Sequence, residues 1–440
     1  MKRFRSCLLA LTLSFPAASI FHDAALAQAA PSAKQQEEAD LRAELQRIVE
    51  EDPAHSAEAQ KALTALDKPD TSAEGRQARN RRERGARRIV NGLPSRSHPA
   101  VGALVKGSTP GKAGAWCTGT LVGCDKFLTA AHCIADEPVP ASYMVFFQEL
   151  GFFRVKAIQW VPEKYDTPIY DVAMLTLEKP VEGIAPMAIN MSVKPLNNTL
   201  ATIVGFGRTG GARQDYGIKR EGSVRTAACT GPFAKAPVIC WNFDADVKSS
   251  GSAQNTCNVD SGGGIFMRDN DGPRIVEKVF AIVSGGTDAN CTKNDLSYNL
   301  DVFQYRDWIK EAGEGRLSSA MCGRPLFEDK VREPVRTTLT LNAKKPEATV
   351  TIEAPAGVGS LRIAMNAEND ASGKNQFQFS AFGGQGPAAA ENACKDSGTG
   401  QFAFCAIDKP ANGTWTIAVS RKKGQGQVQI TTLFVGRDGQ

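Results

Sequence analysis

Between residues 89 and 322 the chain consists of short apolar runs that end at glycine, proline or asparagine. Examples are residues 101–105, 201–205 and 279–283. No helical period extends between these runs, so strands joined by tight turns are the expected structure. Many short strands in one segment are typical of an antiparallel barrel or sandwich. The fold class predicted for the chain is therefore all-β.

Three short motifs within this segment contain residue types that act together in nucleophilic catalysis. His132 lies in the sequence TAAHC, Asp171 begins the sequence DVAML, and Ser261 lies in the sequence DSGG. A serine hydroxyl needs an adjacent base when it attacks a carbonyl, and the pKa of histidine suits that task near neutral pH. An aspartate holds the imidazole in the required tautomer. We therefore predict that His132, Asp171 and Ser261 form a catalytic triad.

These motifs, in this order, resemble the trypsin/chymotrypsin family of serine endopeptidases from Ile89 to Cys322. Residues 284–286 resemble the family's edge strand, and residues 301–309 resemble the start of its terminal helix. The resemblance implies a double six-stranded antiparallel β-barrel with the site between the barrels. It also implies a hydrolase that cuts protein or peptide substrates through an acyl-enzyme, with no cofactor and no metal.

The residues around Ile89 indicate that such an enzyme is made as a zymogen. In the family, cleavage before this position creates an α-ammonium group that pairs with the aspartate preceding the nucleophile. Here the pair would be Ile89 and Asp260, and the cleavage site for an activating protease would be Arg88. Because an unpaired buried carboxylate is costly, this pair would hold the oxyanion loop in shape only after cleavage.

The first 88 residues are predicted to be removed during export and activation. Residues 1–27 combine a basic start, a short apolar run and a small-residue cleavage site, as in a signal peptide. Residues 28–88 are predicted to be a helical or disordered propeptide ending in an arginine-rich linker. The apolar run is too short to span a membrane. We expect a secreted or periplasmic protein with no nucleic-acid partner and no stable membrane insertion.

The composition changes again after Cys322. Residues 323–336 are charged and contain two prolines, which is typical of a linker. Residues 337–440 contain alternating polar and apolar stretches, which predict a C-terminal β-sandwich. The stretch around Trp415 resembles the C-terminal pre-peptidase domains of secreted bacterial proteases.

Cysteine content agrees with an exported protein. The chain has 11 cysteines, and an even number remains once Cys7 leaves with the signal peptide. Sequence alone does not fix the pairing. The absence of a Cys-x-x-Cys pair disfavours zinc. The family resemblance suggests the three pairs Cys117–Cys133, Cys229–Cys240 and Cys257–Cys291. The remaining cysteines would then form Cys394–Cys405 and Cys124–Cys322.

One departure from the family pattern affects the expected oxyanion hole, which would consist of the N–H groups of Val259 and Ser261. Family members have glycine at the position of Val259, and a β-branched residue tolerates positive φ poorly. A misdirected donor here would lower turnover by about 10²–10³-fold. A catalytically weak or inactive homologue that acts as a binding protein is therefore the alternative function. A third possibility, an esterase, lacks the Gly-x-Ser-x-Gly elbow.

A second departure affects the specificity pocket. Trypsins have an aspartate where this chain has Asn255, and the other expected pocket residues are Gly286 and Ser297. Without a carboxylate in the pocket, a basic substrate side chain would lose its hydrating water and gain no charged partner in exchange. We therefore predict poor cleavage after Arg and Lys. Ser284 and Gly286 are expected to bind the substrate backbone.

Overall fold

The computed structural model describes residues 89–436, apart from 96, 246–251, 253, 272–273, 327–329, 370–375, 384–393 and 396–399. The chain divides into two units, Met1–Gly85 and Ala86–Gln440, and every described residue belongs to the second. The predicted signal peptide, the propeptide and Arg88 lie outside the described residues. Within the described part, no helix is long and apolar enough to cross a membrane.

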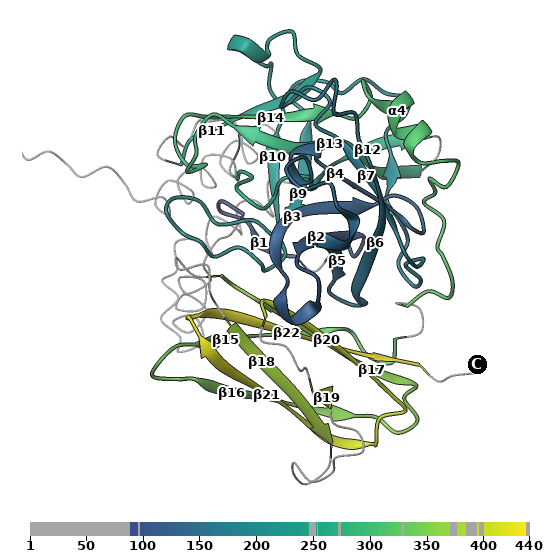
Figure 1. Cartoon of the computed structure of the whole chain (residues 1–440), viewed down its shortest axis with the longest axis vertical. Coiled ribbons are helices and arrows are strands. Elements are labelled where there is room, and N and C mark those ends of the chain that lie inside the picture. Colours follow the sequence, from purple (N-terminus) through teal and green to yellow (C-terminus); the bar gives the residue numbers. More distant parts are fainter. Residues whose placement is uncertain are drawn as a thin grey trace, which may run out of the picture. The chain divides into compact units, whose positions relative to one another are not determined.

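The first half of the protease segment is a closed six-stranded barrel with strand order β2-β3-β4-β7-β6-β5 (Figure 1). Its strands are β2 (Val101–Lys106), β3 (Gly114–Leu121), β4 (Lys126–Thr129), β5 (Tyr143–Phe147), β6 (Gly151–Gln159) and β7 (Ala173–Leu177). Gly102 and Gly119 face each other across β2 and β3. A Cβ atom on Gly119 would lie 2.3 Å from the Phe127 ring, so phenylalanine side chains fill this interior only because glycine leaves room.

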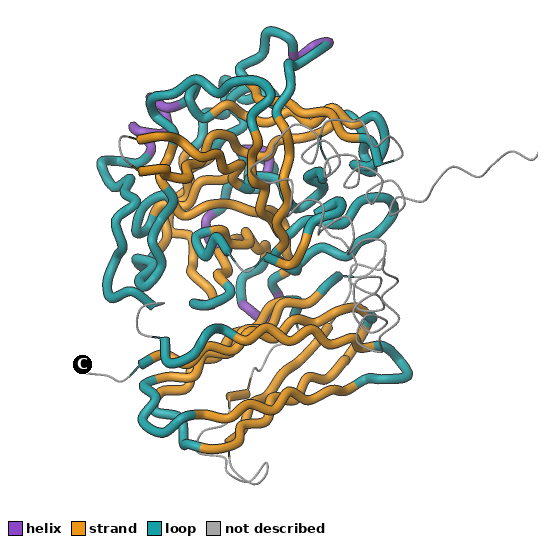
Figure 2. Tube along the Cα trace, turned by 180° about the vertical axis from the view of Figure 1, so that it is seen from behind, coloured by secondary structure: helices purple, strands orange, loops and turns teal. Residues whose placement is uncertain are grey.

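The second half is an eight-stranded sheet with the path β1-β10-β9-β12-β13-β14-β11, and β8 pairs with β13. These strands are β1 (Leu93–Pro94), β8 (Ala188–Ile189), β9 (Leu200–Gly205), β10 (Arg220–Arg225), β11 (Val238–Phe243), β12 (Gly264–Asp271), β13 (Arg274–Gly286) and β14 (Asp295–Asp301). The predicted all-β class is confirmed (Figure 2).

The terminal helix begins later than predicted. Helix α4 spans Arg306–Ala312, whereas the sequence placed its start near residue 301. Asp301 instead ends β14 and begins a turn, in which its carboxylate accepts the N–H of Phe303 over 3.0 Å. Its carbonyl accepts the N–H of Gln304 over 3.1 Å, which directs the chain away from the strand before the helix begins.

The C-terminal region is a sandwich of two four-stranded sheets, ordered β15-β22-β17-β20 and β16-β21-β18-β19. Trp415 is fully buried in its core, and the indole N–H donates to the carbonyl of Ala411 over 2.8 Å. Strand β15 begins two residues before the predicted boundary at 337. The strands are β15 (Val335–Leu341), β16 (Glu347–Ala354), β17 (Ser360–Ala367), β18 (Gln376–Gly383), β19 (Cys394–Lys395), β20 (Phe402–Asp408), β21 (Gly413–Lys423) and β22 (Gly426–Val435).

Five disulfides cross-link the described residues. Four lie in the protease segment, and the fifth joins β19 of one sandwich sheet to β20 of the other. The pairs are those suggested at the sequence level, Cys117–Cys133, Cys124–Cys322, Cys229–Cys240, Cys257–Cys291 and Cys394–Cys405.

Crowding inside the barrel predicts a stability difference between two glycines of β3. Gly119→Ala should destabilise the barrel by about 1–3 kcal/mol, because the new methyl group overlaps Phe127. Gly114→Ala is the matched control, since its Cβ would meet nothing closer than 3.8 Å. Thermal unfolding of both variants tests this, and equal melting temperatures would contradict the packing argument.

Candidate active site

Two of the three predicted catalytic residues are in direct contact. His132 lies in the short turn η2 (Ala131–Cys133), and its Nδ1 atom is 2.9 Å from Asp171 Oδ2. The His132 backbone N–H donates to the other carboxylate oxygen over 2.9 Å. The Asp171 side chain is fully buried, whereas that of His132 is 27% exposed. The carboxylate therefore fixes the orientation of an imidazole that remains accessible.

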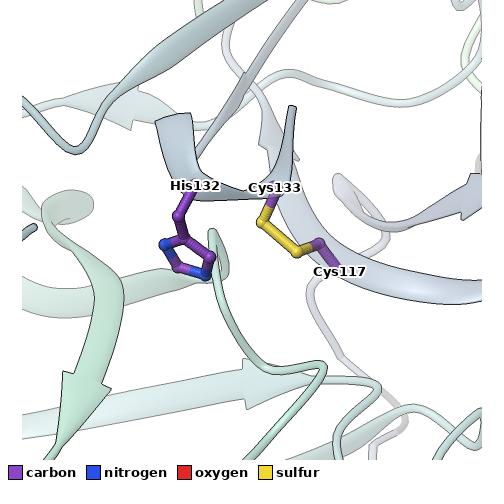
Figure 3. A group of neighbouring side chains, drawn as sticks. All are labelled: Cys117, His132 and Cys133. Carbon is purple, nitrogen blue, oxygen red and sulfur yellow. A yellow bond between two sulfur atoms is a disulfide. The ribbon is translucent and has the colours of Figure 1, made fainter. Parts of the chain in front are cut away.

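The backbone of Ser261 contacts Cys133, the residue that follows His132, and Thr118 of β3. Its carbonyl oxygen is 3.7 Å from the Cys133 sulfur and accepts the N–H of Thr118 over 2.8 Å. A ring nitrogen of His132 and the two sulfur atoms lie within 4.8 Å of one another (Figure 3). The sulfur atoms are bonded to each other, so this cluster offers no thiolate ligands to a metal.

Ser284 has a contact that the sequence did not reveal. Its hydroxyl donates to Asp171 Oδ2, so the buried carboxylate is held by a third donor. Ser284 lies near the end of β13, and the neighbouring Val283 exchanges backbone hydrogen bonds of 2.8 and 2.9 Å with Gly262 and Gly263. The strand expected to bind substrate backbone therefore runs directly beside the serine loop.

Val259 has a backbone φ of +77°. This is the conformation that glycine adopts without strain, and a residue with a Cβ atom pays about 1–2 kcal/mol for it. The hydroxyl of Thr118 donates to the Val259 carbonyl over 2.7 Å and helps to hold the turn. The structure thus places valine in the backbone conformation expected of an oxyanion-hole residue, despite its side chain.

Asp260 is buried beneath this loop. Its two carboxylate oxygens accept the N–H groups of Gly207 and Cys257 over 2.7 and 2.9 Å. Burial raises the pKa of Asp260 to about 7, although both hydrogen bonds act in the opposite direction. Ile89 and Val90 are also buried, in one cluster with Cys257. The two members of the expected activation pair are therefore both buried.

A pocket of about 200 Å³ opens next to Ser261. Gly286 and Tyr298 line it. A Cβ atom on Gly285 would lie 2.7 Å from the Tyr298 hydroxyl, so this tyrosine occupies the space beside the strand. Of the expected pocket residues, Gly286 is in the lining, whereas Ser297 is buried and contacts the Gly285 carbonyl.

Asn255, which the sequence predicts as a pocket residue, is fully buried and is not among the residues that line this pocket. Its amide oxygen accepts the indole N–H of Trp241 over 2.8 Å, and its amide nitrogen donates to Asp295 over 2.6 Å and to the Cys291 carbonyl over 3.3 Å. Its backbone N–H donates to Val90 over 3.2 Å. The polar atoms of Asn255 are therefore engaged by the protein itself.

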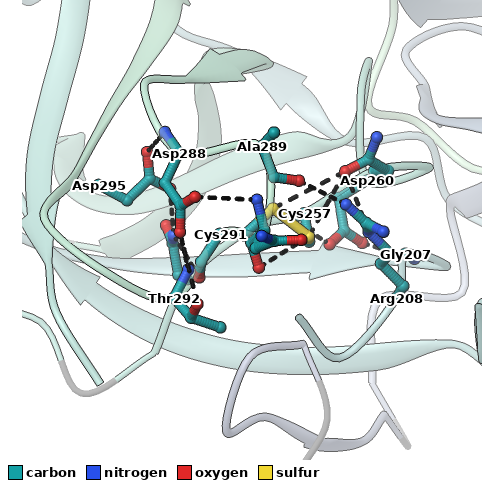
Figure 4. Close-up of a disulfide and its surroundings, with 12 residues drawn as sticks. Gly207, Arg208, Cys257, Asp260, Asp288, Ala289, Cys291, Thr292 and Asp295 are labelled. Atoms are coloured by element: carbon teal, nitrogen blue, oxygen red, sulfur yellow. Dashed lines mark hydrogen bonds between the residues drawn. A yellow bond between two sulfur atoms is a disulfide. The ribbon is translucent and has the colours of Figure 1, made fainter. Parts of the chain in front are cut away.

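The premise that the pocket lacks a carboxylate is wrong, because Asp295 lines it. Asp295 is 2% exposed, at the start of β14, and a Cβ atom on Gly286 would lie 2.5 Å from its Oδ1. Asp288 is also in the lining, but backbone N–H groups of its own loop donate to it and lower its pKa. In Figure 4, both aspartates lie on one side of the Cys257–Cys291 disulfide and Asp260 lies on the other.

The antiparallel barrel, the His132–Asp171 pair and a side-chain pocket beside Ser261 define the fold class of chymotrypsin-like serine proteases. The Trypsin family model matches residues 89–309. The chain belongs to the trypsin family of serine proteases.

Individual relatives are distant. The chain is 32% identical over 180 residues to a trypsin of Saccharopolyspora erythraea, and the match covers 38% of this chain and 75% of that protein. It is 27% identical over 243 residues to the clotting factor G beta subunit of Tachypleus tridentatus, and this match covers 48% of the chain and 75% of the subunit. It is 25% identical over 227 residues to the platelet-aggregating proteinase PA-BJ of Bothrops jararaca, covering 47% and 87%.

The positive φ of Val259 predicts an unusual response to glycine. Val259→Gly should leave peptide hydrolysis within about threefold of the parent, because the loop already has the required shape. It should also stabilise the loop by up to about 1 kcal/mol through relief of strain. Steady-state kinetics and thermal unfolding measure both effects. A gain of about 10²-fold in turnover would instead mean that valine misdirects the donor.

Proposed function

We propose that this protein is an exported serine endopeptidase that cuts protein substrates through an acyl-enzyme. The observation that carries the proposal is the hydrogen bond between the buried Asp171 carboxylate and His132, together with a pocket that Ser261 lines. A family member with this arrangement needs no cofactor for amide hydrolysis.

The proposed reaction is that of a Ser-His-Asp triad. Ser261 Oγ attacks the substrate carbonyl carbon while His132 takes the hydroxyl proton, and the N–H groups of Val259 and Ser261 bind the developing oxyanion. Asp171 stabilises the imidazolium that forms, and Ser284 keeps that carboxylate in place. The imidazolium then gives its proton to the leaving amine. A water molecule, deprotonated by His132, releases the acid and restores the serine.

Activation by cleavage after Arg88 is part of the proposal. The raised pKa of Asp260 supports it, because a buried carboxylate whose pKa is about 7 would be strongly stabilised in its charged form by a cation. Cleavage would turn the buried Ile89 into that cation. The mature protein should then begin at Ile89.

Asp295 changes the specificity we propose. The Asp288 N–H and the Thr287 hydroxyl donate to its Oδ1 over 3.0 and 3.5 Å, whereas Oδ2 accepts only the Asn255 amide over 2.6 Å among the described residues, which leaves acceptor capacity on Oδ2. A buried carboxylate in a narrow pocket pairs well with a guanidinium or ammonium group. We therefore propose that the enzyme cleaves after Arg and Lys, in contrast to the poor cleavage there that Asn255 alone predicts. Arg88 of a second copy then becomes a possible substrate, so activation does not require a different protease.

Labelling with a fluorophosphonate tests the proposed activity. The wild-type protein cleaved at Arg88 should label at Ser261, whereas Ser261→Ala should not label and should lose at least about 10⁴-fold in turnover. Asp171→Asn should lose about 10⁴-fold, as in the chymotrypsin-type triad. Absence of labelling in correctly cleaved wild type would favour the binding-protein alternative.

The role of Asp295 predicts a substrate-dependent defect. Asp295→Asn should lower kcat/KM for arginine substrates by about 10²–10³-fold, because the bound cation loses its buried partner. The same variant should keep its activity toward a matched substrate with glutamine at the cleaved position. An equal loss on both substrates would mean that Asp295 only supports the fold.

A further inference from the structure

The β-sandwich contacts the protease segment through a buried ion pair. Arg220, at the start of β10, is fully buried, and its Nη2 atom lies 3.1 Å from Oε1 of Glu368. Glu368 follows β17 in the sandwich and is 5% exposed. Its other carboxylate oxygen accepts the N–H of Gln427 over 2.9 Å, which fixes the side chain to its own sheet. The Arg220 guanidinium is therefore in contact with a carboxylate from outside the protease segment.

Arg220 connects this ion pair to the oxyanion loop. Its Nη1 atom donates to the carbonyl oxygens of Gly207 and Ile218 over 3.2 and 2.9 Å. The N–H of the same Gly207 donates to Asp260 over 2.7 Å. A Cβ atom on Gly207 would lie 2.3 Å from the Asp260 carboxylate, so the backbone here has no room to shift toward it. The position of Arg220 therefore determines where a main donor to Asp260 lies.

A second route runs through Phe206, the residue before Gly207. Its ring packs edge-on against Phe402 of β20, with centroids 6.2 Å apart. Its N–H donates over 3.1 Å to the hydroxyl of Thr118, which in turn donates to the carbonyl of Val259. The sandwich is thus connected to Val259 and Asp260, the two residues that precede Ser261. The connections run through the consecutive residues Phe206 and Gly207.

The sandwich also holds the far end of the same loop. Gln401 donates to the Tyr216 carbonyl over 2.7 Å and accepts the N–H of Ala115 over 2.8 Å. The N–H of Asn369 donates to the same Tyr216 carbonyl over 3.0 Å. Gly217, with φ of +115°, would clash with Gln401 if it had a side chain. Residues 206–217 are therefore held by the sandwich at both ends.

From these contacts we infer that Glu368 is a positioning residue for catalysis, which acts through Arg220 and Gly207 on the loop that forms the oxyanion hole. The inference rests on the proposed peptidase activity and goes beyond it, because it assigns the C-terminal sandwich a role in the chemical step. Removing the Glu368 charge takes away the carboxylate that the Arg220 guanidinium contacts directly, so the guanidinium shifts and its hydrogen bond to the Gly207 carbonyl weakens.

The test compares two buried carboxylates at the same domain contact. Glu368→Gln removes the charge beside Arg220, and Glu149→Gln removes the charge beside Arg336 of β15, where the atoms are 2.8 Å apart. Both variants should lower the melting temperature of the full chain. Glu368→Gln alone should lower kcat and the rate of fluorophosphonate labelling by about 10–100-fold, with KM within about threefold, since oxyanion donors act in the transition state.

Equal kcat losses in the two variants, or an unchanged kcat in Glu368→Gln, would overturn the inference. If Glu368→Gln does not fold, Glu368→Asp replaces it, because the shorter side chain keeps the charge but withdraws it from the Arg220 guanidinium. An unchanged kcat in that variant also overturns the inference. The wild-type protein in the same assay distinguishes failure of the proposed function from failure of this inference. If the wild type does not react, both are contradicted. If the wild type reacts and the two variants lose kcat equally, only the inference is contradicted.

Discussion

The buried carboxylate of Asp260 is the point on which the active-site half of this molecule depends. A charge in such a position is costly, so its surroundings must supply donors from every side. Gly207 and Cys257 supply them from the backbone, and Arg220 acts from a distance to lower its pKa. Because Val259 and Ser261 are its chain neighbours, the arrangement that satisfies Asp260 also shapes the oxyanion loop.

The sequence predicts those parts of the site that are encoded by local motifs. His132, Asp171 and Ser261 are each surrounded by a few residues of distinctive type, and the all-β class follows from turn residues between short apolar runs. Closure of the first barrel and the eight-stranded path of the second sheet depend on pairings between distant segments, which periodicity does not contain.

The parts that the sequence does not reveal share one physical property, since each depends on a long-range contact. Asp295 lies among turn residues and has no motif of its own, yet β13 and β14 place it against Gly286. Ser284 contacts a carboxylate 113 residues away in the chain. The sequence predicts Asn255 as a pocket residue, but it cannot show that Trp241, Cys291 and Asp295 occupy its amide and keep it out of the lining.

The arginine at the start of β10 has an evolutionary consequence. A fully buried guanidinium is tolerated only where a carboxylate meets it, and here the carboxylate belongs to an appended domain. Once such a residue is present, deletion of the appendage is no longer neutral, because it removes the carboxylate that the buried guanidinium contacts. The two parts are then inherited together, and a lineage could return to the single-domain form only after Arg220 had first been replaced by an uncharged residue.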